Sequence, residues 1–161
     1  MQVFGFAGWS GSGKTTLIER LIALFVADGL RVATIKHTHH DFDLDHPGKD
    51  SWRHREAGAT EVLLTSDRRW ALLHELGDAA EPDLQTLLAK LEPCDAVLIE
   101  GCKFADVPKL EVYRAALGKP CLHAGDSAII AVVTDSVVQT DLPCLDINQP
   151  QQIYDFLKAR L

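Results

Sequence analysis

The sequence GWSGSGKTT, residues 8–16, contains the pattern Gly-x-x-x-x-Gly-Lys-Thr from Gly8 to Thr15. It follows the apolar run VFGFA of residues 3–7 and precedes a leucine-rich segment. Glycines allow a loop to curl so that successive backbone N–H groups point inward, and the following helix adds the positive end of its dipole. The pattern therefore predicts a phosphate-binding loop between a strand and a helix.

Two side chains of this loop are predicted to contact a nucleotide and its metal ion. Lys14 would reach the β- and γ-phosphates, and the Thr15 hydroxyl would bind Mg²⁺. From average residue usage, a chance match to the pattern in a chain of this length is on the order of 1 in 200. The alternative is a glycine-rich turn that binds nothing, but the strand before the pattern and the amphipathic helix after it favour phosphate binding.

Composition and charge predict a cytoplasmic protein. The 161 residues are 47% hydrophobic, enough for one domain with a sizeable core. The net charge of −7 argues against general affinity for nucleic acid or for anionic membranes. No signal peptide or membrane-length apolar run is visible. Cys94, Cys102, Cys121 and Cys144 form no Cys-x-x-Cys pair, so we expect free thiols of a reducing compartment.

Alternating apolar and amphipathic segments predict an α/β fold of the P-loop NTPase type. Strands are expected at 3–7, 31–35, 95–100, 109–114, 128–133 and 142–147, and helices at 14–27, 50–57, 83–91 and 151–161. The spacing of residues 3–35 is that of a βαβ unit, so the first two of these strands should be parallel in one sheet. We expect a mostly parallel sheet, covered on both faces and flanked by helices, in a single domain of residues 1–161.

The segment TEVLLTSDRRWALLHEL, residues 60–76, has apolar runs on both sides of Asp67-Arg68-Arg69 and predicts an inserted antiparallel β-hairpin. Its large apolar residues are numerous for a two-stranded ribbon, which is marginally stable alone. They are Val62, Leu63, Leu64, Trp70, Leu72 and Leu73. We therefore expect one face of the hairpin to cover its own domain and the exposed strand edge to pair with a second copy in a homodimer.

An acid at the end of a second buried strand completes the predicted metal site. DAVLIEG, residues 95–101, ends in Glu100 followed by a glycine that permits close approach to phosphates. P-loop proteins use such a carboxylate to hold Mg²⁺ or the water around it. The alternative is a strand-end acid in solvent.

A polar stretch of residues 36–51, KHTHHDFDLDHPGKDS, is too long for an ordinary connection, which favours a functional loop. Asp50 would reach Mg²⁺ directly or through water, or would cap the helix that follows. Lys49 would contact phosphate. The run Asp45-His-Pro-Gly48 matches the Asp-x-x-Gly of GTPase switches in letters only, because that motif normally follows the strand that Glu100 ends.

Four histidines of this stretch, His37, His39, His40 and His46, are dense enough to suggest a transition-metal site. They lack a nearby cysteine or a fixed helical spacing. We therefore expect histidines that are solvated or contact phosphate.

The usual guanine-reading motif Asn-Lys-x-Asp is absent, and the only asparagine is Asn148. A carboxylate can still accept hydrogen bonds from guanine N1 and N2. Asp135, at the end of AIIAVVTD, is placed at a strand end where it would make this contact. The alternative is that it caps the strand end.

Four segments together give this chain a resemblance to the molybdopterin-guanine dinucleotide biosynthesis protein B family, MobB. They are GWSGSGKTTL, IKHTHHDFDLDHPGKDSWRHREAGA, TSDRRWALLHEL and VLIEG. The resemblance covers nearly the whole chain, and the histidine–aspartate segment is much more specific than the P-loop. Cys102 is a departure, because the family often has an aromatic residue after Glu-Gly, and this leaves the packing of the Lys103 loop open.

The resemblance implies a GTP-binding homodimer of the class that includes the signal-recognition-particle GTPases and dethiobiotin synthetase. It implies slow GTP hydrolysis and an adapter role beside the guanylyltransferase that joins GMP to molybdopterin, with a molybdoenzyme as a second candidate partner. By motif match, the nucleotide ligands are Gly11, Gly13, Lys14, Thr15 and Thr16, joined by Gly8, Ser10 and Ser12 of the same loop. Lys14 and Glu100 would carry any catalysis, with GTP and Mg²⁺ as cofactors.

Chemistry alone leaves three classes of function open. A small-molecule kinase would need an acceptor pocket and usually an arginine-rich lid, and no such segment is apparent. A metal-insertion GTPase would use a Cys/His chelating site, for which the spacing is missing. The third class is a nucleotide-dependent adapter, which the hairpin would suit. No glutamine follows Glu100 in the place where a GTPase positions water, so we expect intrinsic GTP turnover well below about one per second.

Overall fold

The computed structural model describes residues 1–38, 42–101 and 105–161. The chain divides into two compact units, one formed by Met1–His37 with Ala89–Leu161 and the other by Thr38–Leu88. The first unit contains a six-stranded sheet in the order β2-β5-β1-β6-β7-β8. All its strand pairs are parallel, which confirms the predicted fold class.

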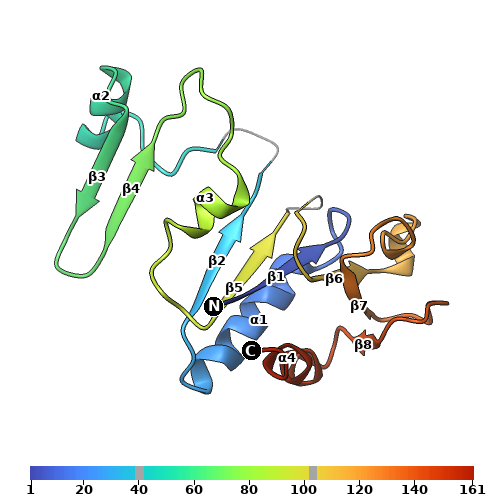
Figure 1. The fold of residues 1–161 in the computed structure, drawn as a ribbon. Coiled ribbons are helices and arrows are strands. Elements are labelled where there is room, and N and C mark those ends of the chain that lie inside the picture. Colours follow the sequence, from blue (N-terminus) through green and yellow to red (C-terminus); the bar gives the residue numbers. More distant parts are fainter. Residues whose placement is uncertain (39–41, 102–104) are drawn as a thin grey trace. The chain divides into compact units, whose positions relative to one another are not determined.

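The strands of this sheet fall where apolar runs predict them. They are β1 (Gln2–Ala7), β2 (Val32–Lys36), β5 (Ala96–Glu100), β6 (Lys109–Tyr113), β7 (Ile129–Thr134) and β8 (Cys144–Asp146). β1 and β2 lie in one parallel sheet as expected, but they are not neighbours, because β5 lies between them (Figure 1). Parallel strands place all their carboxyl ends at one edge of the sheet, and the phosphate loop follows β1 at that edge.

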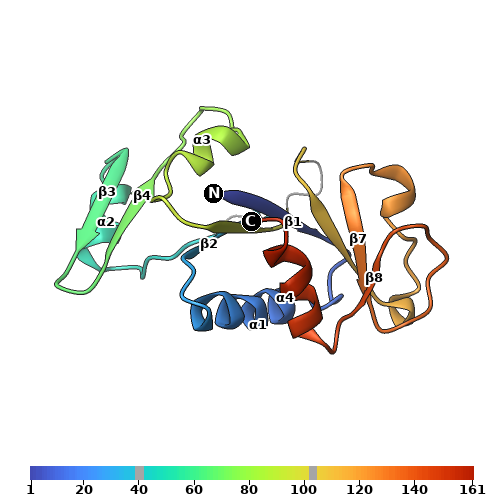
Figure 2. The ribbon, with the colours of Figure 1, turned by 60° about the horizontal axis from the view of Figure 1, so that its bottom comes forward.

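Helices α1 (Lys14–Ala27) and α4 (Pro150–Lys158) lie on the same side of this sheet (Figure 2). Together they cover one continuous apolar core. Its helical members are Leu17, Ile18, Leu21, Phe25, Ile153, Tyr154 and Leu157, and they meet Phe4, Phe6, Leu98, Leu110, Val112 and Val133 of the sheet. The core residues of β1 and of β6 are two positions apart along each strand, so their side chains point to the face that the helices cover.

The opposite face of β6 is covered by residues 114–128. This segment contains two short 3₁₀ turns, Ala115–Leu117 and His123–Gly125. It is fixed by polar contacts to the strands, such as the 2.6 Å ion pair between Lys109 and Asp126.

The second unit contains α2 (Asp50–Glu56), β3 (Glu61–Thr65), β4 (Trp70–His74) and α3 (Leu84–Leu88). β3 and β4 form the predicted antiparallel hairpin, and they make a sheet of their own. α2 contacts β3. α3 is shorter than the predicted helix 83–91, because the chain leaves helical geometry in a turn at residues 89–90.

The register of the hairpin puts Leu63 opposite Leu72 and Thr65 opposite Trp70, so these residues share one face. Leu63 and Trp70 are each 61% exposed. The other face carries Val62 and Leu73, which are half-buried.

Among the residues that the structure describes, no helix has the length and apolar character needed to cross a bilayer.

Candidate nucleotide-binding site

The phosphate loop turns sharply where β1 ends. Gly8 has a φ of 153°, and a Cβ atom at this position would lie 2.5 Å from the carbonyl oxygen of Val112. Only glycine therefore lets the loop pass so close to β6. The loop then enters α1 directly, since the amide of Leu17 donates to the Gly13 carbonyl at 3.0 Å.

Lys14 lies across the mouth of this loop. Its ammonium group donates to the carbonyl oxygens of Gly8 and Trp9, each at 3.0 Å. These contacts hold a positive charge beside the curled backbone, as phosphate binding requires. The Ser12 hydroxyl is buried and has no hydrogen-bond partner among the described residues, so a polar ligand in the loop would satisfy it. The residues present therefore fit a polyphosphate.

The predicted metal ligands Thr15 and Glu100 are in direct contact. The Thr15 hydroxyl donates to Oε1 of Glu100 at 2.7 Å, while Oε2 of Glu100 lies 3.7 Å from the ammonium group of Lys36. A hydroxyl and a carboxylate at the start of a helix are oxygen ligands of the kind that Mg²⁺ prefers. The donor set therefore fits Mg²⁺.

The backbone after Glu100 is as constrained as that at Gly8. Gly101 has a φ of 96°, and a Cβ atom there would lie 2.5 Å from the carbonyl oxygen of His37. The amide of His37 in turn donates to the Glu100 carbonyl at 2.9 Å. The ends of β2 and β5 are therefore fixed together beside the loop.

Arg114 connects the phosphate loop to Asp135. Its Nε donates to the carbonyl oxygen of Ser12 at 3.2 Å, and its Nη1 donates to Oδ2 of Asp135 at 2.6 Å. The hydroxyl of Ser136 donates to the other carboxylate oxygen at 2.9 Å. The hydrogen bond from Ser136, followed by those from Arg114, lowers the pKa of Asp135 below its usual value. Asp135 is therefore held ionised and oriented, as an acceptor for a base must be.

An open hollow of about 350 Å³ lies beside Asp135. It is lined by Thr134, Asp135, Ser136, Val137, Cys144, Leu145, Asp146 and Asn148. The hollow offers carboxylate acceptors, which suit the N–H edge of a nucleobase.

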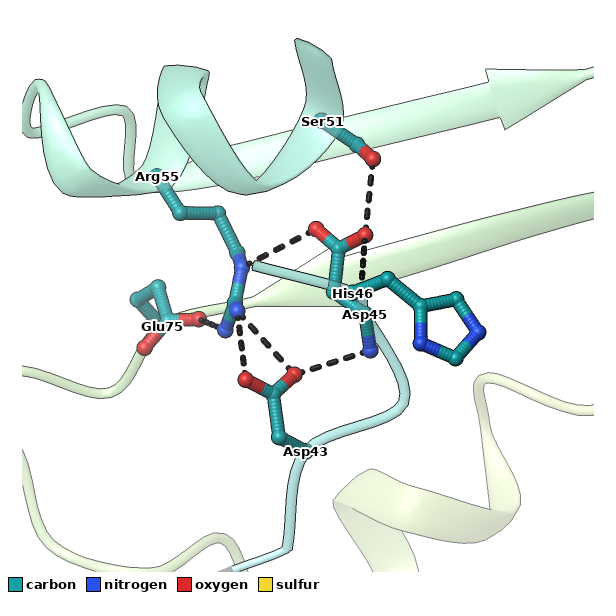
Figure 3. A network of polar contacts seen from close by, with 6 residues as sticks. All are labelled: Asp43, Asp45, His46, Ser51, Arg55 and Glu75. Atoms are coloured by element: carbon teal, nitrogen blue, oxygen red, sulfur yellow. Dashed lines mark hydrogen bonds and ion pairs between the residues drawn. The ribbon is translucent and has the colours of Figure 1, made fainter. Parts of the chain in front are cut away.

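The polar stretch of the second unit is organised around Arg55 (Figure 3). The guanidinium group of Arg55 binds both oxygens of Asp43 at 3.0 Å and donates to Glu75 at 2.9 Å. Asp45 lies 3.5 Å from Nε of Arg55 and accepts from the Ser51 hydroxyl at 2.8 Å. Asp45 thus has a structural role within this unit. This role is consistent with the expectation that Asp45-His-Pro-Gly48 matches the Asp-x-x-Gly motif in letters only.

Lys49 and Asp50, two other predicted residues of this stretch, are exposed at the start of α2. Asp50 is the first residue of α2, is exposed, and lies 3.8 Å from Arg53. Lys49 precedes it at the N-cap position, and its side chain makes no cap hydrogen bond. Their contacts to metal and phosphate stay predictions. His37 belongs to the first unit and His46 to the second, whereas His39 and His40 lie outside the described residues, as does Cys102.

Arg114 and Lys36 are site residues that the sequence did not reveal. Lys36 ends β2 and Arg114 follows β6, so both lie at the carboxyl edge of the parallel sheet, where ligands bind. That position is the sequence signal for a role in the site. A single basic residue at a strand end ordinarily indicates a solvated surface, so the sequence alone does not place either residue in the site.

Comparisons with known proteins show which family this chain is similar to. Residues 3–135 match the family described as "Molybdopterin guanine dinucleotide synthesis protein B". The "Molybdopterin-guanine dinucleotide biosynthesis adapter protein" of Escherichia coli (strain K12) is 42% identical over 98% of this chain and 91% of its own. The protein of the same description from Haemophilus influenzae is 41% identical over 98% of this chain and 88% of its own.

A solved structure described as "molybdopterin-guanine biosynthesis protein B (mobB)" superposes with a TM-score of 0.79. It is 27% identical, and the match covers 98% of this chain and 97% of the other.

Proposed function

Because this chain belongs to the MobB family, whose curated relatives are named as adapter proteins of molybdopterin-guanine dinucleotide biosynthesis, we propose that it is a GTP-binding adapter in molybdenum cofactor biosynthesis. The observation that carries nucleotide binding is the Lys14 ammonium group held across the glycine loop, next to the paired Thr15 and Glu100 side chains. The loop takes the phosphates, and Thr15 with Glu100 takes Mg²⁺.

Guanine is the proposed base, and Asp135 is the residue proposed to read it. Arg114 and Ser136 hold both oxygens of its carboxylate, which leaves further lone pairs for the N1 and N2 donors of guanine. Adenine presents no such donor pair. The hollow beside Asp135 supports this assignment, because it leaves room for a base next to the carboxylate. Arg114 also binds the phosphate loop and so connects the proposed base site to the phosphate site.

Hydrolysis in the isolated protein is proposed to be slow. Efficient GTPases orient the attacking water with a side chain and meet the developing charge with a cation. Lys14 supplies part of that charge, and Glu100 is followed by Gly101, Cys102 and Lys103 without a water-orienting glutamine. Slow turnover suits a protein whose nucleotide state governs its contact with another protein.

The proposed partners are the molybdopterin guanylyltransferase and a second copy of this chain, with a molybdoenzyme as a further candidate. The exposed face with Leu63, Trp70 and Leu72 supports a homodimer through the hairpin, because such side chains gain from burial against an equivalent face.

Calorimetric titration of the purified protein with GTP, GDP and ATP, with and without Mg²⁺, tests this function. We expect GTP to bind more tightly than ATP and Mg²⁺ to strengthen binding. A single-turnover GTPase assay with and without the guanylyltransferase then tests the adapter role. Fast hydrolysis by the isolated protein, or phosphate transfer to a small acceptor, would identify an enzyme instead.

A further inference from the structure

A buried polar layer lies on the face of β6 that points away from α1 and α4. Leu110 and Val112 face the helical core, so the alternating residues Lys109, Glu111 and Tyr113 face the covering segment 114–128. Glu111 is fully buried, which is unusual for a carboxylate. The proposed nucleotide site uses none of these side chains.

Glu111 is tightly bound by that segment. Its Oε1 accepts from the amide of Leu122 at 2.6 Å, and its Oε2 accepts from the amide of His123 at 3.0 Å. Oε2 also lies 2.6 Å from Nδ1 of His123. The side chains of Glu111 and His123 are 1% and 12% exposed. Since each carboxylate oxygen has two lone pairs, Oε1 retains one for a further ligand.

Cys121 completes a group of three potential metal ligands. One ligand atom each from Glu111, Cys121 and His123 can be chosen so that all lie within 4.8 Å of one another. Cys121 and His123 come from the same covering segment, and Glu111 comes from the strand beneath it. A cation between this buried carboxylate and the cysteine sulfur would neutralise the buried negative charge.

We propose that Glu111, Cys121 and His123 form a binding site for a zinc-like divalent cation. Carboxylate, thiolate and imidazole are the ligand types of protein zinc sites, whereas Mg²⁺ prefers oxygen ligands alone. The thiol loses its proton to solvent when the metal–sulfur bond forms. Three protein ligands leave a fourth coordination position for water or an incoming ligand, as in open rather than purely structural sites.

The backbone supports this site in the way that outer contacts support known metal ligands. The amides of Leu122 and His123 fix the Glu111 carboxylate, and they thereby also fix the backbone next to Cys121. The same hydrogen bonds would equally serve a purely structural clamp over β6. The two roles differ in one property, since a clamp does not bind metal through sulfur.

Cobalt(II) titration of the nucleotide-free full chain distinguishes them. We expect binding of one ion, with a thiolate-to-cobalt charge-transfer band and the intense visible bands of a tetrahedral ion. Cys121→Ser should abolish the charge-transfer band, and His123→Gln should weaken affinity by roughly tenfold or more. Cys144→Ser removes an exposed thiol away from the cluster and should leave the band unchanged.

A second measurement covers the case in which a variant is poorly folded. Zn²⁺ should raise the unfolding temperature of the wild type and of Cys144→Ser by mass action, and Glu111→Gln should reduce this rise. A wild type without the charge-transfer band, or a Cys121→Ser variant with the same band, would overturn the proposal. Neither result bears on GTP binding, because none of these three side chains belongs to the proposed nucleotide site.

Discussion

The hydroxyl of Thr15 donates a hydrogen bond to Glu100 at 2.7 Å, and this bond joins the first turn of α1 to the carboxyl end of β5. The two residues are 85 positions apart in the chain. Their contact requires β5 to lie directly beside β1, which the strand order provides. A sheet with β2 next to β1 would separate these two oxygen ligands.

Removing either partner of this pair should weaken the response to Mg²⁺. We expect Thr15→Ala to lose Mg²⁺–GTP affinity and Thr15→Ser, which keeps the hydroxyl, to retain most of it. Glu100→Gln should reduce the gain from Mg²⁺ more than it reduces affinity without metal. Calorimetry with and without Mg²⁺ measures both quantities. Equal losses under the two conditions would mean that Glu100 acts only on the structure of the loop.

Lys14→Ala should remove most nucleotide affinity. Removing a charged group that contacts a polyphosphate typically costs about 2–5 kcal/mol of binding free energy. The ammonium group of Lys14 is held beside the glycine loop by the carbonyl oxygens of Gly8 and Trp9. Lys90→Ala, which changes an exposed lysine that has no place in the site, is the matched control. Unchanged GTP affinity in Lys14→Ala, measured by calorimetry, would rule out the phosphate-loop assignment.

Most of the first unit could be predicted because local signals and global fold agree there. The bounds of α1 match the prediction, since the glycine loop precedes it and Gly29 follows it. Strand order could not be predicted, because fully buried parallel strands lack the alternation that would distinguish neighbours. The contacts of Arg114 could not be predicted either, since they depend on which strand lies beside β1.

The second unit shows the opposite balance. Sequence indicated the hairpin and α2, but it gave no sign that Arg55 would bind Asp43, Asp45 and Glu75 together. Ion pairs between residues this far apart in the chain depend on the packing of α2 over the hairpin. A polar stretch that resembles a solvated loop can therefore be a structural network.

Acid should remove the stabilisation that Asp28 provides at the end of α1. Asp28 accepts from Lys158 and Tyr154 of α4, and the hydrogen bond from Lys158, then that from Tyr154, lowers its pKa. A pKa lower in the folded state means that the stabilisation is present above the unfolded value and is lost as pH falls through the folded value. Asp28→Asn should therefore be less stable than wild type at about pH 7 and should approach it at about pH 2.

Urea denaturation across this range measures the difference between the two proteins. Asp78→Asn provides a control, because it changes an exposed aspartate of the other unit. A difference for Asp28→Asn that does not shrink in acid would show that the carboxylate charge is not its source.

Substitution on the exposed hairpin face should dissociate the proposed homodimer. Leu72→Lys places a charge opposite Leu63 and near Trp70, where burial against a second copy would desolvate it. We expect multi-angle light scattering to show a dimer for wild type and a monomer for this variant. Arg68→Ala, in the turn of the same hairpin, should remain dimeric. A wild-type monomer at micromolar concentration would contradict the dimer itself.

Asp135 should determine the preference for guanine. Asp135→Ala removes the proposed acceptor for N1 and N2, so we expect GTP affinity to fall by roughly tenfold or more, while ATP affinity changes little. Because Arg114 also binds the Ser12 carbonyl, Arg114→Ala should weaken both nucleotides by loosening the phosphate loop. Competition titrations with GTP and ATP separate these two patterns, and Asp141→Ala is the control at an exposed aspartate of the same unit. Equal losses of GTP and ATP in Asp135→Ala would assign this carboxylate to fixing Arg114 and would leave the base to be read by other residues.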